Sequence, residues 1–284
     1  MNVFISTCCI KNKYLSNLCN LFYINNIKNV ELSAGYYQKD INQIIKKFSK
    51  KINLQIHNYF PVPKKPFVFN LSSENNLIES KSIKHAKKAI KIASKLKRKI
   101  YSFHAGYLVD PSINDLGKHM KKVNVFNRNE SIKRFIKNVK IISLYAKKYG
   151  VKLLIENNVI SKQEVLNFKK NIVLMADPKE INLIFSKLPS NVKMLLDVAH
   201  FKVSSNSLNF PLIKSVKKID KWIEGYHLSD NNGLVDSNKA VTNKSWFWPI
   251  IKRNLNYYTI EVYNLKISQI LKQKKLVEKK LMFL

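Results

Sequence analysis

Asp197 and His200 stand at and just beyond the end of an apolar stretch, MLLDVAH at residues 194–200. Burying an ionised carboxylate is costly unless a cation or a reacting molecule compensates for it. Other apolar stretches also end in an acid or an imidazole, and these residues are His57, His104, Glu156, His227 and Glu261. Mixed imidazole and carboxylate ligands suit a divalent ion such as Zn²⁺, Mn²⁺, Co²⁺, Fe²⁺ or Mg²⁺. The set therefore predicts a metal site, with the identity of the ion left open.

The segments that would carry these residues recur along the whole chain and have the length of β-strands. They are 3–6, 30–32, 54–57, 100–104, 151–156, 192–197, 223–227 and 258–261. Lys-rich segments with helical spacing of apolar residues lie between them, as at 82–96, 131–150 and 177–188. In the last of these, Asp177 is expected as the N-cap and Pro178 as the first helical residue. The chain after residue 265 is expected to form the final helix.

Strand and helix alternate about eight times, which predicts an α/β protein with parallel strands and right-handed crossovers. Eight units close into a single (β/α)8 barrel, and we expect one domain over residues 1–284. An open doubly wound sheet is the rival, but it usually carries a Gly-rich phosphate turn, and this chain has six Gly and no such motif. In a barrel, the C-terminal ends of all strands meet at one mouth. The acids and imidazoles would therefore converge there, and the mutual repulsion of the carboxylates is a second reason to expect a cation.

The histidines follow the same pattern. The chain has six, and four of them stand at or just past expected strand ends. One such His is more often a packed core residue than a ligand, but four of them with three acids favour a site. His85 and His119 fall in an expected helix and loop, and we expect both on the surface.

The charge of the chain is strongly basic, with 51 Lys and Arg against 18 Asp and Glu, a net charge of +33. Such a balance is compatible with a nucleic-acid-binding surface. The basic residues are nearly all Lys and are spread along the whole chain, which is also what a biased composition gives. Nucleic acid therefore stays open as a partner, behind a small substrate.

Other bulk features bear on location. No apolar stretch is long enough for a membrane span, and the N-terminal segment lacks the pattern of a signal peptide, so a cytoplasmic protein is expected. Cys8, Cys9 and Cys19 have neither CxxC spacing nor a disulfide pattern, and we expect reduced thiols. The oligomeric state is left open.

An ordered set of motifs resembles a known group, the xylose-isomerase-like TIM barrel superfamily, which includes sugar isomerases and epimerases and the endonuclease IV type of AP endonuclease. The motifs run in order over nearly the whole chain: VELS (30–33), IHNYFP (56–61), FNLSS (69–73), FHAGY (103–107), IENN (155–158), LDVAHF (196–201), HLSDNNGLVD (227–236) and IEVYN (260–264).

The resemblance implies ligands position by position. Four residues match the metal site shared by the superfamily: Glu156, Asp197, His227 and Glu261. His57 and His104 match ligands of a further metal in the endonuclease-like branch, and His200 and Asp236 match ligands of a third. The remaining partner of that third metal should be a His two residues after Asp236, but Asn238 stands there.

This departure bears on the reaction that the resemblance implies. Phosphodiester cleavage is suited to clustered ions, whereas isomerisation or epimerisation needs one ion and two carboxylates that move a proton. We therefore expect a metal-dependent sugar (phosphate) isomerase or epimerase acting on a small carbohydrate or polyol, with Glu156 and Glu261 as the acid/base pair and His200 as a further catalytic group. His57 and His104 would bind substrate or a second ion.

The residues after the seventh expected strand have two interpretations. Asp230 and Asp236 could orient ligands or cap the loop. Trp246, Phe247 and Trp248 could stack on a sugar or pack under the last helix. An AP-site nuclease and a degenerate barrel that only binds a ligand or partner remain the alternative functions.

Overall fold

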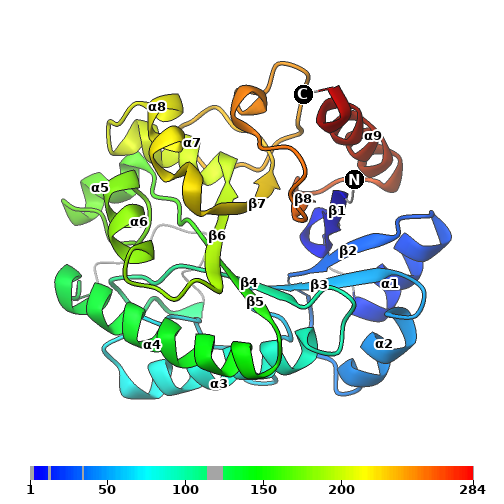
Figure 1. Ribbon diagram of the computed structural model, residues 1–284, viewed down its shortest axis with the longest axis horizontal. Helices are drawn as coiled ribbons and strands as arrows, with labels where there is room; N and C mark the ends of the chain where they lie inside the picture. The colour runs from blue at the N-terminus through cyan, green and yellow to red at the C-terminus, as the bar shows by residue number, and fades with distance from the viewer. Residues whose placement is uncertain (1–2, 12–13, 34, 114–123, 284) are drawn as a thin grey trace.

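The eight expected strands form a closed parallel barrel in the order β1 to β8, each hydrogen-bonded to its neighbours in sequence and β8 to β1 (Figure 1). The structure is a computed structural model that describes residues 3–11, 14–33, 35–113 and 124–283. The strands are β1 Val3–Ser6, β2 Asn29–Leu32, β3 Asn53–His57, β4 Ile100–His104, β5 Lys152–Glu156, β6 Val192–Asp197, β7 Ile223–Leu228 and β8 Tyr258–Ile260. The barrel prediction is confirmed.

Helices follow most strands and cover the barrel. They are α1 Leu15–Ile24, α2 Ile41–Phe48, α3 Asn76–Ala93, α4 Arg128–Lys148, α5 Lys162–Phe168, α6 Pro178–Phe185, α7 Val198–Ser207, α8 Leu212–Ile219 and α9 Ile267–Phe283, with short 3-10 turns at Thr7–Cys9, Asp220–Trp222 and Trp248–Ile250. Asp177 caps α6 as predicted, since its carboxylate accepts the backbone N–H groups of Lys179 and Glu180. Between β7 and β8, residues 229–257 are all described and contain no α-helix. No described helix has the length and apolar character needed to cross a bilayer.

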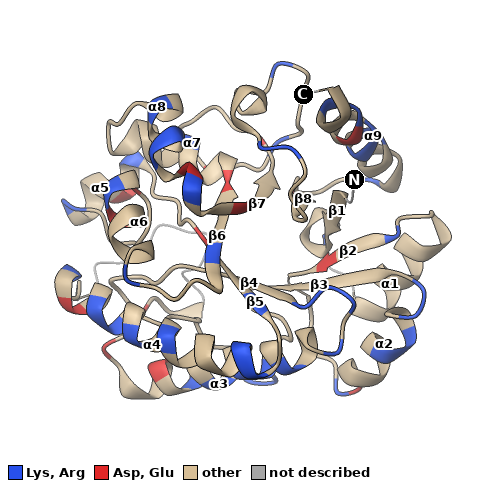
Figure 2. Ribbon diagram, in the orientation of Figure 1, with Lys and Arg blue, Asp and Glu red and all other residues tan. Residues whose placement is uncertain are grey.

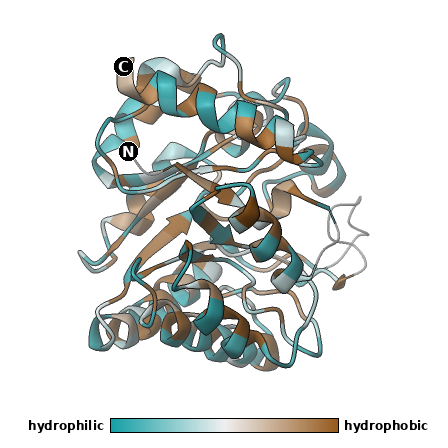
Figure 3. Ribbon diagram, turned by 90° about the vertical axis from the view of Figure 1, so that its right-hand side faces the viewer, coloured by the Kyte–Doolittle hydropathy of each residue, from teal (hydrophilic) through white to brown (hydrophobic). Residues whose placement is uncertain are grey.

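The strands are rich in apolar residues (Figure 3). Most of their buried apolar side chains form one core cluster with apolar residues of the helices. Lys and Arg occur in many elements, among them α2, α3, α4 and α9, and no single described element gathers them (Figure 2). Because the helices hold the strands from outside, side chains at the strand ends are free to face the mouth.

The sequence places two histidines, His85 and His119, on the surface. His85, expected on the surface, is buried in α3, where its ring stacks on Tyr59 with centroids 5.2 Å apart. It lies on the inward stripe of that helix, so the apolar pattern around it outweighed its polarity. His119 lies outside the described residues.

Candidate metal centre

Four residues from four strand ends meet at the mouth of the barrel. Each offers a ligand atom within 4.8 Å of every other, and the residues are Glu156, Asp197, His227 and Glu261. Nδ1 of His227 lies 2.7 Å from Oε2 of Glu261 and 3.2 Å from Oε1 of Glu156. The register brings them together, because β6 pairs Asp197 directly with His227 of β7. Glu261 lies one residue beyond the end of β8.

The position of Asp197 explains the MLLDVAH stretch. Asp197 is both the last residue of β6 and the N-cap of α7, and its Oδ1 accepts the backbone N–H of His200 at 2.8 Å. Across the strand pair, the amide side chain of Asn157 bonds both the N–H and the C=O of Asp197. The backbone is thus fixed on both sides, which leaves the second carboxylate oxygen directed at the cluster.

Two carboxylate oxygens show that this group fits a cation. Oε2 of Glu156 and Oδ2 of Asp197 are fully buried, and among the described residues neither has a hydrogen-bond partner. Buried carboxylate oxygens without a donor are costly, and a divalent ion would satisfy both. The donors are three carboxylates and one imidazole, a set suited to Zn²⁺, Mn²⁺ or a similar ion.

A second group shares Glu156. His57, His104 and Glu156 also have ligand atoms within 4.8 Å of one another. Nε2 of His57 lies 3.3 Å and Nε2 of His104 lies 3.6 Å from Oε2 of Glu156. The two imidazoles therefore stand beside the four-donor cluster, on the side of β3 and β4. They could take part in the same centre or hold an adjacent ion.

His200 and Asp236 form a third pair at the mouth. Nδ1 of His200 lies 3.0 Å from the carbonyl oxygen of Asn157, and Nε2 lies 3.2 Å from Oδ2 of Asp236. Asn238 turns to Ser229, whose hydroxyl donates to its amide oxygen at 2.6 Å. Its amide nitrogen donates to Oδ2 of Asp236 at 3.4 Å, so Asn238 supports that carboxylate at the position where the resemblance would require an imidazole.

The electrostatics are those of tightly packed opposite charges. Burial alone would raise the pKa of Glu156, but the imidazoles of His104, His227 and His57 hold it well below its usual range. Burial opposes protonation of His227, yet three carboxylates around it raise its pKa well above the usual value. Burial raises the pKa of Asp197 to about 7, and the nearby Glu156 and Asp236 carboxylates add to this while His200 opposes it.

The remaining predicted residues lie apart from the cluster. Asp230 pairs with Nζ of Lys202 at 2.9 Å and accepts the N–H of Asn231, so it fastens the loop after β7. Trp248 donates from its indole to the carbonyl of Thr242, and the ammonium of Lys280 in α9 lies over its ring. Phe247 is fully buried. These contacts fit the loop-capping and packing interpretations.

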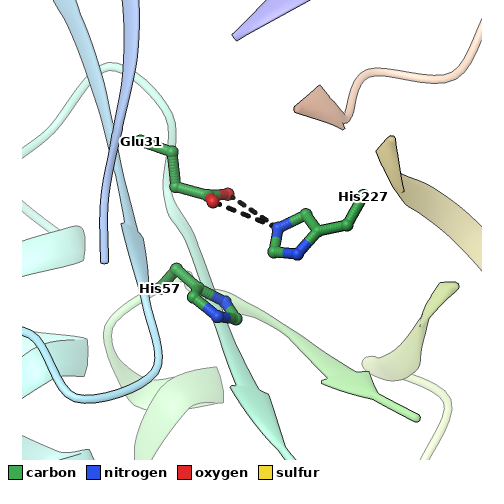
Figure 4. A group of neighbouring side chains, drawn as sticks. All are labelled: Glu31, His57 and His227. Carbon is green, nitrogen blue, oxygen red and sulfur yellow. Dashed lines mark hydrogen bonds and ion pairs between the residues drawn. The ribbon is translucent and has the colours of Figure 1, made fainter. Parts of the chain in front are cut away.

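The sequence reasoning missed Glu31. This residue of β2 is fully buried, and its carboxylate faces Nε2 of His227 at 3.1 Å from Oε1 and 3.3 Å from Oε2 (Figure 4). The signal was present, since a carboxylate stands between Val30 and Leu32 in a buried strand. It was passed over because Glu31 is not the last residue of its segment. Cys8, expected only as a reduced thiol, also reaches the cluster: it lies in the 3-10 turn after β1, and its thiol donates to Oε1 of Glu261 at 3.1 Å.

Several solved structures have a similar fold. A D-tagatose 3-epimerase-like protein is 18% identical, with a TM-score of 0.73 over 100% of this chain and 98% of that one. D-psicose 3-epimerase from Clostridium cellulolyticum, solved with D-tagatose, is 13% identical with a TM-score of 0.64 over 99% and 94%. Endonuclease IV from Thermus thermophilus is 11% identical with a TM-score of 0.61 over 100% of both chains. At these identities the likeness shows the fold alone.

Sequence comparison supplies the family. No curated protein sequence matches the chain. The model of the xylose isomerase-like TIM barrels matches residues 25–261, which is most of the chain and contains every residue of the four-donor cluster. The chain therefore belongs to the family of xylose isomerase-like TIM barrels.

Proposed function

We propose that this protein is a divalent-metal-dependent isomerase or epimerase of a small sugar or polyol-like substrate. One observation carries the proposal: two glutamates, Glu156 and Glu261, both contact His227 in one buried four-donor cluster at the mouth. A bound ion in such a cluster polarises a carbonyl and its neighbouring hydroxyl. Two carboxylates beside it can then remove and return a proton at the adjacent carbon.

The two glutamates have different environments, as two groups with different roles in proton transfer would need. Glu156 is fully buried, and its carboxylate faces the imidazoles of His57 and His104. Glu261 is slightly exposed, and its Oε1 accepts the thiol proton of Cys8. Glu261 therefore has a proton donor at hand on the side open to a substrate. His200 is held by Asn157 at Nδ1 and by Asp236 at Nε2, so it would reach a substrate hydroxyl by sharing its Nε2 proton with Asp236.

The substrate class rests on similarity as well as on the site. The similar solved structures include a D-tagatose 3-epimerase-like protein and a D-psicose 3-epimerase solved with D-tagatose. Tyr263 lies two residues after Glu261 and is only partly exposed. Partial burial and the Glu261 carboxylate raise the pKa of its phenol, so the phenol remains a neutral donor beside the site. A polyhydroxylated substrate suits these donors. A cytoplasmic location and a single domain remain expectations.

The test is proton exchange with solvent. The zinc- or manganese-loaded protein is incubated in D2O with a panel of ketoses that includes D-tagatose, and deuterium at the carbon next to the carbonyl is followed by NMR. We expect exchange in at least one ketose, and a loss of about 10²-fold or more in Glu156→Gln and in Glu261→Gln. Glu224→Gln is the matched control, because Glu224 lies in β7 like His227 but pairs with Lys152 near the other end of the strand. If the metal-loaded protein introduces no deuterium into any ketose of the panel, the proposal is wrong.

A second candidate, AP-site phosphodiester cleavage, is favoured by a specific observation. Imidazoles and acids beyond the four-donor cluster converge on it, and these are His57, His104, His200 and Asp236. Asn238 opposes it, since it replaces the imidazole that a third ion would need. Incision of a duplex with an abasic site, abolished by Glu156→Gln and retained by Glu224→Gln, would favour this candidate over the isomerase.

A further inference from the structure

Beneath the metal centre, a chain of buried hydrogen bonds starts at Glu31 and reaches both His227 and His57. Figure 4 shows the carboxylate of Glu31 directed at the ring of His227, with the ring of His57 beside it. The two rings are close, with centroids 4.7 Å apart. These hydrogen bonds bear on which nitrogen of each imidazole ring carries the proton.

Glu31 can only accept. Its carboxylate is surrounded by donors: the phenol of Tyr257 donates to Oε2, as do Nε2 of Gln55 at 3.0 Å and the hydroxyl of Thr259 at 3.1 Å. Gln55 also donates to the Thr259 oxygen at 3.0 Å, so the proton of Thr259 is free to go to Glu31. An ionised carboxylate with these neighbours has no proton to return.

The proton positions along the branch to His57 follow by elimination. Tyr257 has one hydroxyl proton, and its contact with Glu31 uses it. The oxygen of Ser102 lies 2.6 Å from the Tyr257 oxygen, a contact that two lone pairs cannot make, so Ser102 must supply the proton there. The Ser102 oxygen also lies 2.9 Å from Nδ1 of His57. With its own proton committed, Ser102 accepts, and Nδ1 of His57 carries the proton.

The other nitrogen of a neutral His57 is then a bare lone pair. That atom, Nε2, lies 3.3 Å from Oε2 of Glu156, which is also an acceptor. Two acceptors facing each other at this distance need a positive charge between or beside them, either a second proton on Nε2 or a metal ion. The branch therefore prepares His57 as a ligand.

The branch to His227 has the opposite sense. A cation in the four-donor cluster needs a bare Nδ1 on His227, since that atom faces Glu261 and Glu156. The proton then stays on Nε2, where Glu31 accepts it. Carboxylate partners of this kind orient metal-binding imidazoles and strengthen them as ligands.

We propose that Glu31 is a positioning residue that sets the tautomers of both imidazoles: Nε2–H in His227 through direct contact, and Nδ1–H in His57 through Tyr257 and Ser102. The two adjacent rings thus hold opposite tautomers, and each presents its bare nitrogen to Glu156. This inference rests on the cation site of the proposed function and is independent of the reaction catalysed there.

The experiment reads the tautomers directly. Protein labelled with ¹⁵N-histidine is studied without metal for His57, because no ion then fixes its proton, and with zinc for His227. Long-range ¹H–¹⁵N correlations report which ring nitrogen is protonated. We expect Nε2–H for His227 and Nδ1–H for His57. In Tyr257→Phe only His57 should lose its fixed tautomer. In Glu31→Gln, His57 should lose its fixed tautomer. Zinc on Nδ1 keeps the proton of His227 on Nε2 in this variant, so the loss there appears as a zinc affinity that falls about 10- to 100-fold.

Thr259→Val is the matched control, because Thr259 touches the same carboxylate oxygen but is no link to either imidazole. It should leave both tautomers as in the unsubstituted protein. Rings with the same tautomer would overturn the inference while zinc binding still stands. The same holds if Glu31→Gln leaves both the His57 tautomer and the zinc affinity unchanged. If zinc does not bind, the cation site fails instead, and the His57 tautomer in the metal-free protein still decides the Tyr257 branch. If Glu31→Gln does not fold, Tyr257→Phe decides that branch as well.

Discussion

Acid should weaken the fold through His85, a histidine with no part in the metal centre. His85 is 6% exposed, and its ring lies among Tyr59, Phe67 and Phe69, with centroid distances of 5.2, 6.0 and 5.8 Å. Within the described part of the chain its Nε2 has no hydrogen-bond partner. Burial lowers the pKa of His85 from 6.5 to about 4, only partly offset by a hydrogen bond with the backbone of Asn58.

The sign and size of the effect follow from this shift. In the unfolded chain His85 takes up a proton near pH 6.5, whereas in the folded protein it stays neutral down to about pH 4. The contribution of His85 to the free energy of unfolding is therefore fully present above pH 6.5, and it is lost as the pH falls from 6.5 towards 4. Each pKa unit corresponds to about 1.4 kcal/mol, so the full loss is about 3 kcal/mol.

The assay is urea unfolding of the metal-free protein at pH 7 and at pH 4.5. His85→Phe should lose less stability between these two pH values than the unsubstituted protein does, by about 2–3 kcal/mol. Other groups titrate equally in both proteins, so the comparison isolates His85. Phe69→Leu is the control: it should lower the free energy of unfolding at both pH values without changing their difference. Equal losses in His85→Phe and the unsubstituted protein would refute the reasoning.

Three further predictions concern the site and its support. Zinc at about 100 times its dissociation constant should stabilise the protein by about 2.7 kcal/mol in thermal unfolding, and Asp197→Asn should abolish most of that gain. Gly225→Ala should cost about 1–3 kcal/mol in urea unfolding, because the added Cβ would lie 2.8 Å from Cβ of Tyr257, and unchanged stability would contradict this. Arg128→Met leaves Glu180 buried without its partner and should cost about 3–5 kcal/mol by the same measurement; unchanged stability would show that the pair is dispensable.

The sequence by itself determined the barrel and most of the mouth. Short apolar segments alternating with helical ones leave few topologies, and a parallel barrel places every strand end at one rim. That rule is enough to group His57, His104, Glu156, Asp197 and His227 from the sequence alone. It worked because each of these residues closes or nearly closes its strand, where an apolar run gives way to a polar residue.

Only the tertiary structure decided what lies below and around that rim. Glu31 lies inside its strand, so it does not mark a transition from an apolar run to polar residues. Its contacts become visible only in the fold, where the strand register places it beside Gln55 and its carboxylate faces His227. From the sequence His85 is expected on the surface, but α3 packs with its His85 side towards Tyr59. The sequence offers the same two interpretations for Asp230 and Asp236. In the structure Asp230 pairs with Lys202, whereas Asp236 pairs with His200. Local pattern fixes which residues reach the mouth, whereas the partner of each side chain depends on contacts between segments far apart in the chain.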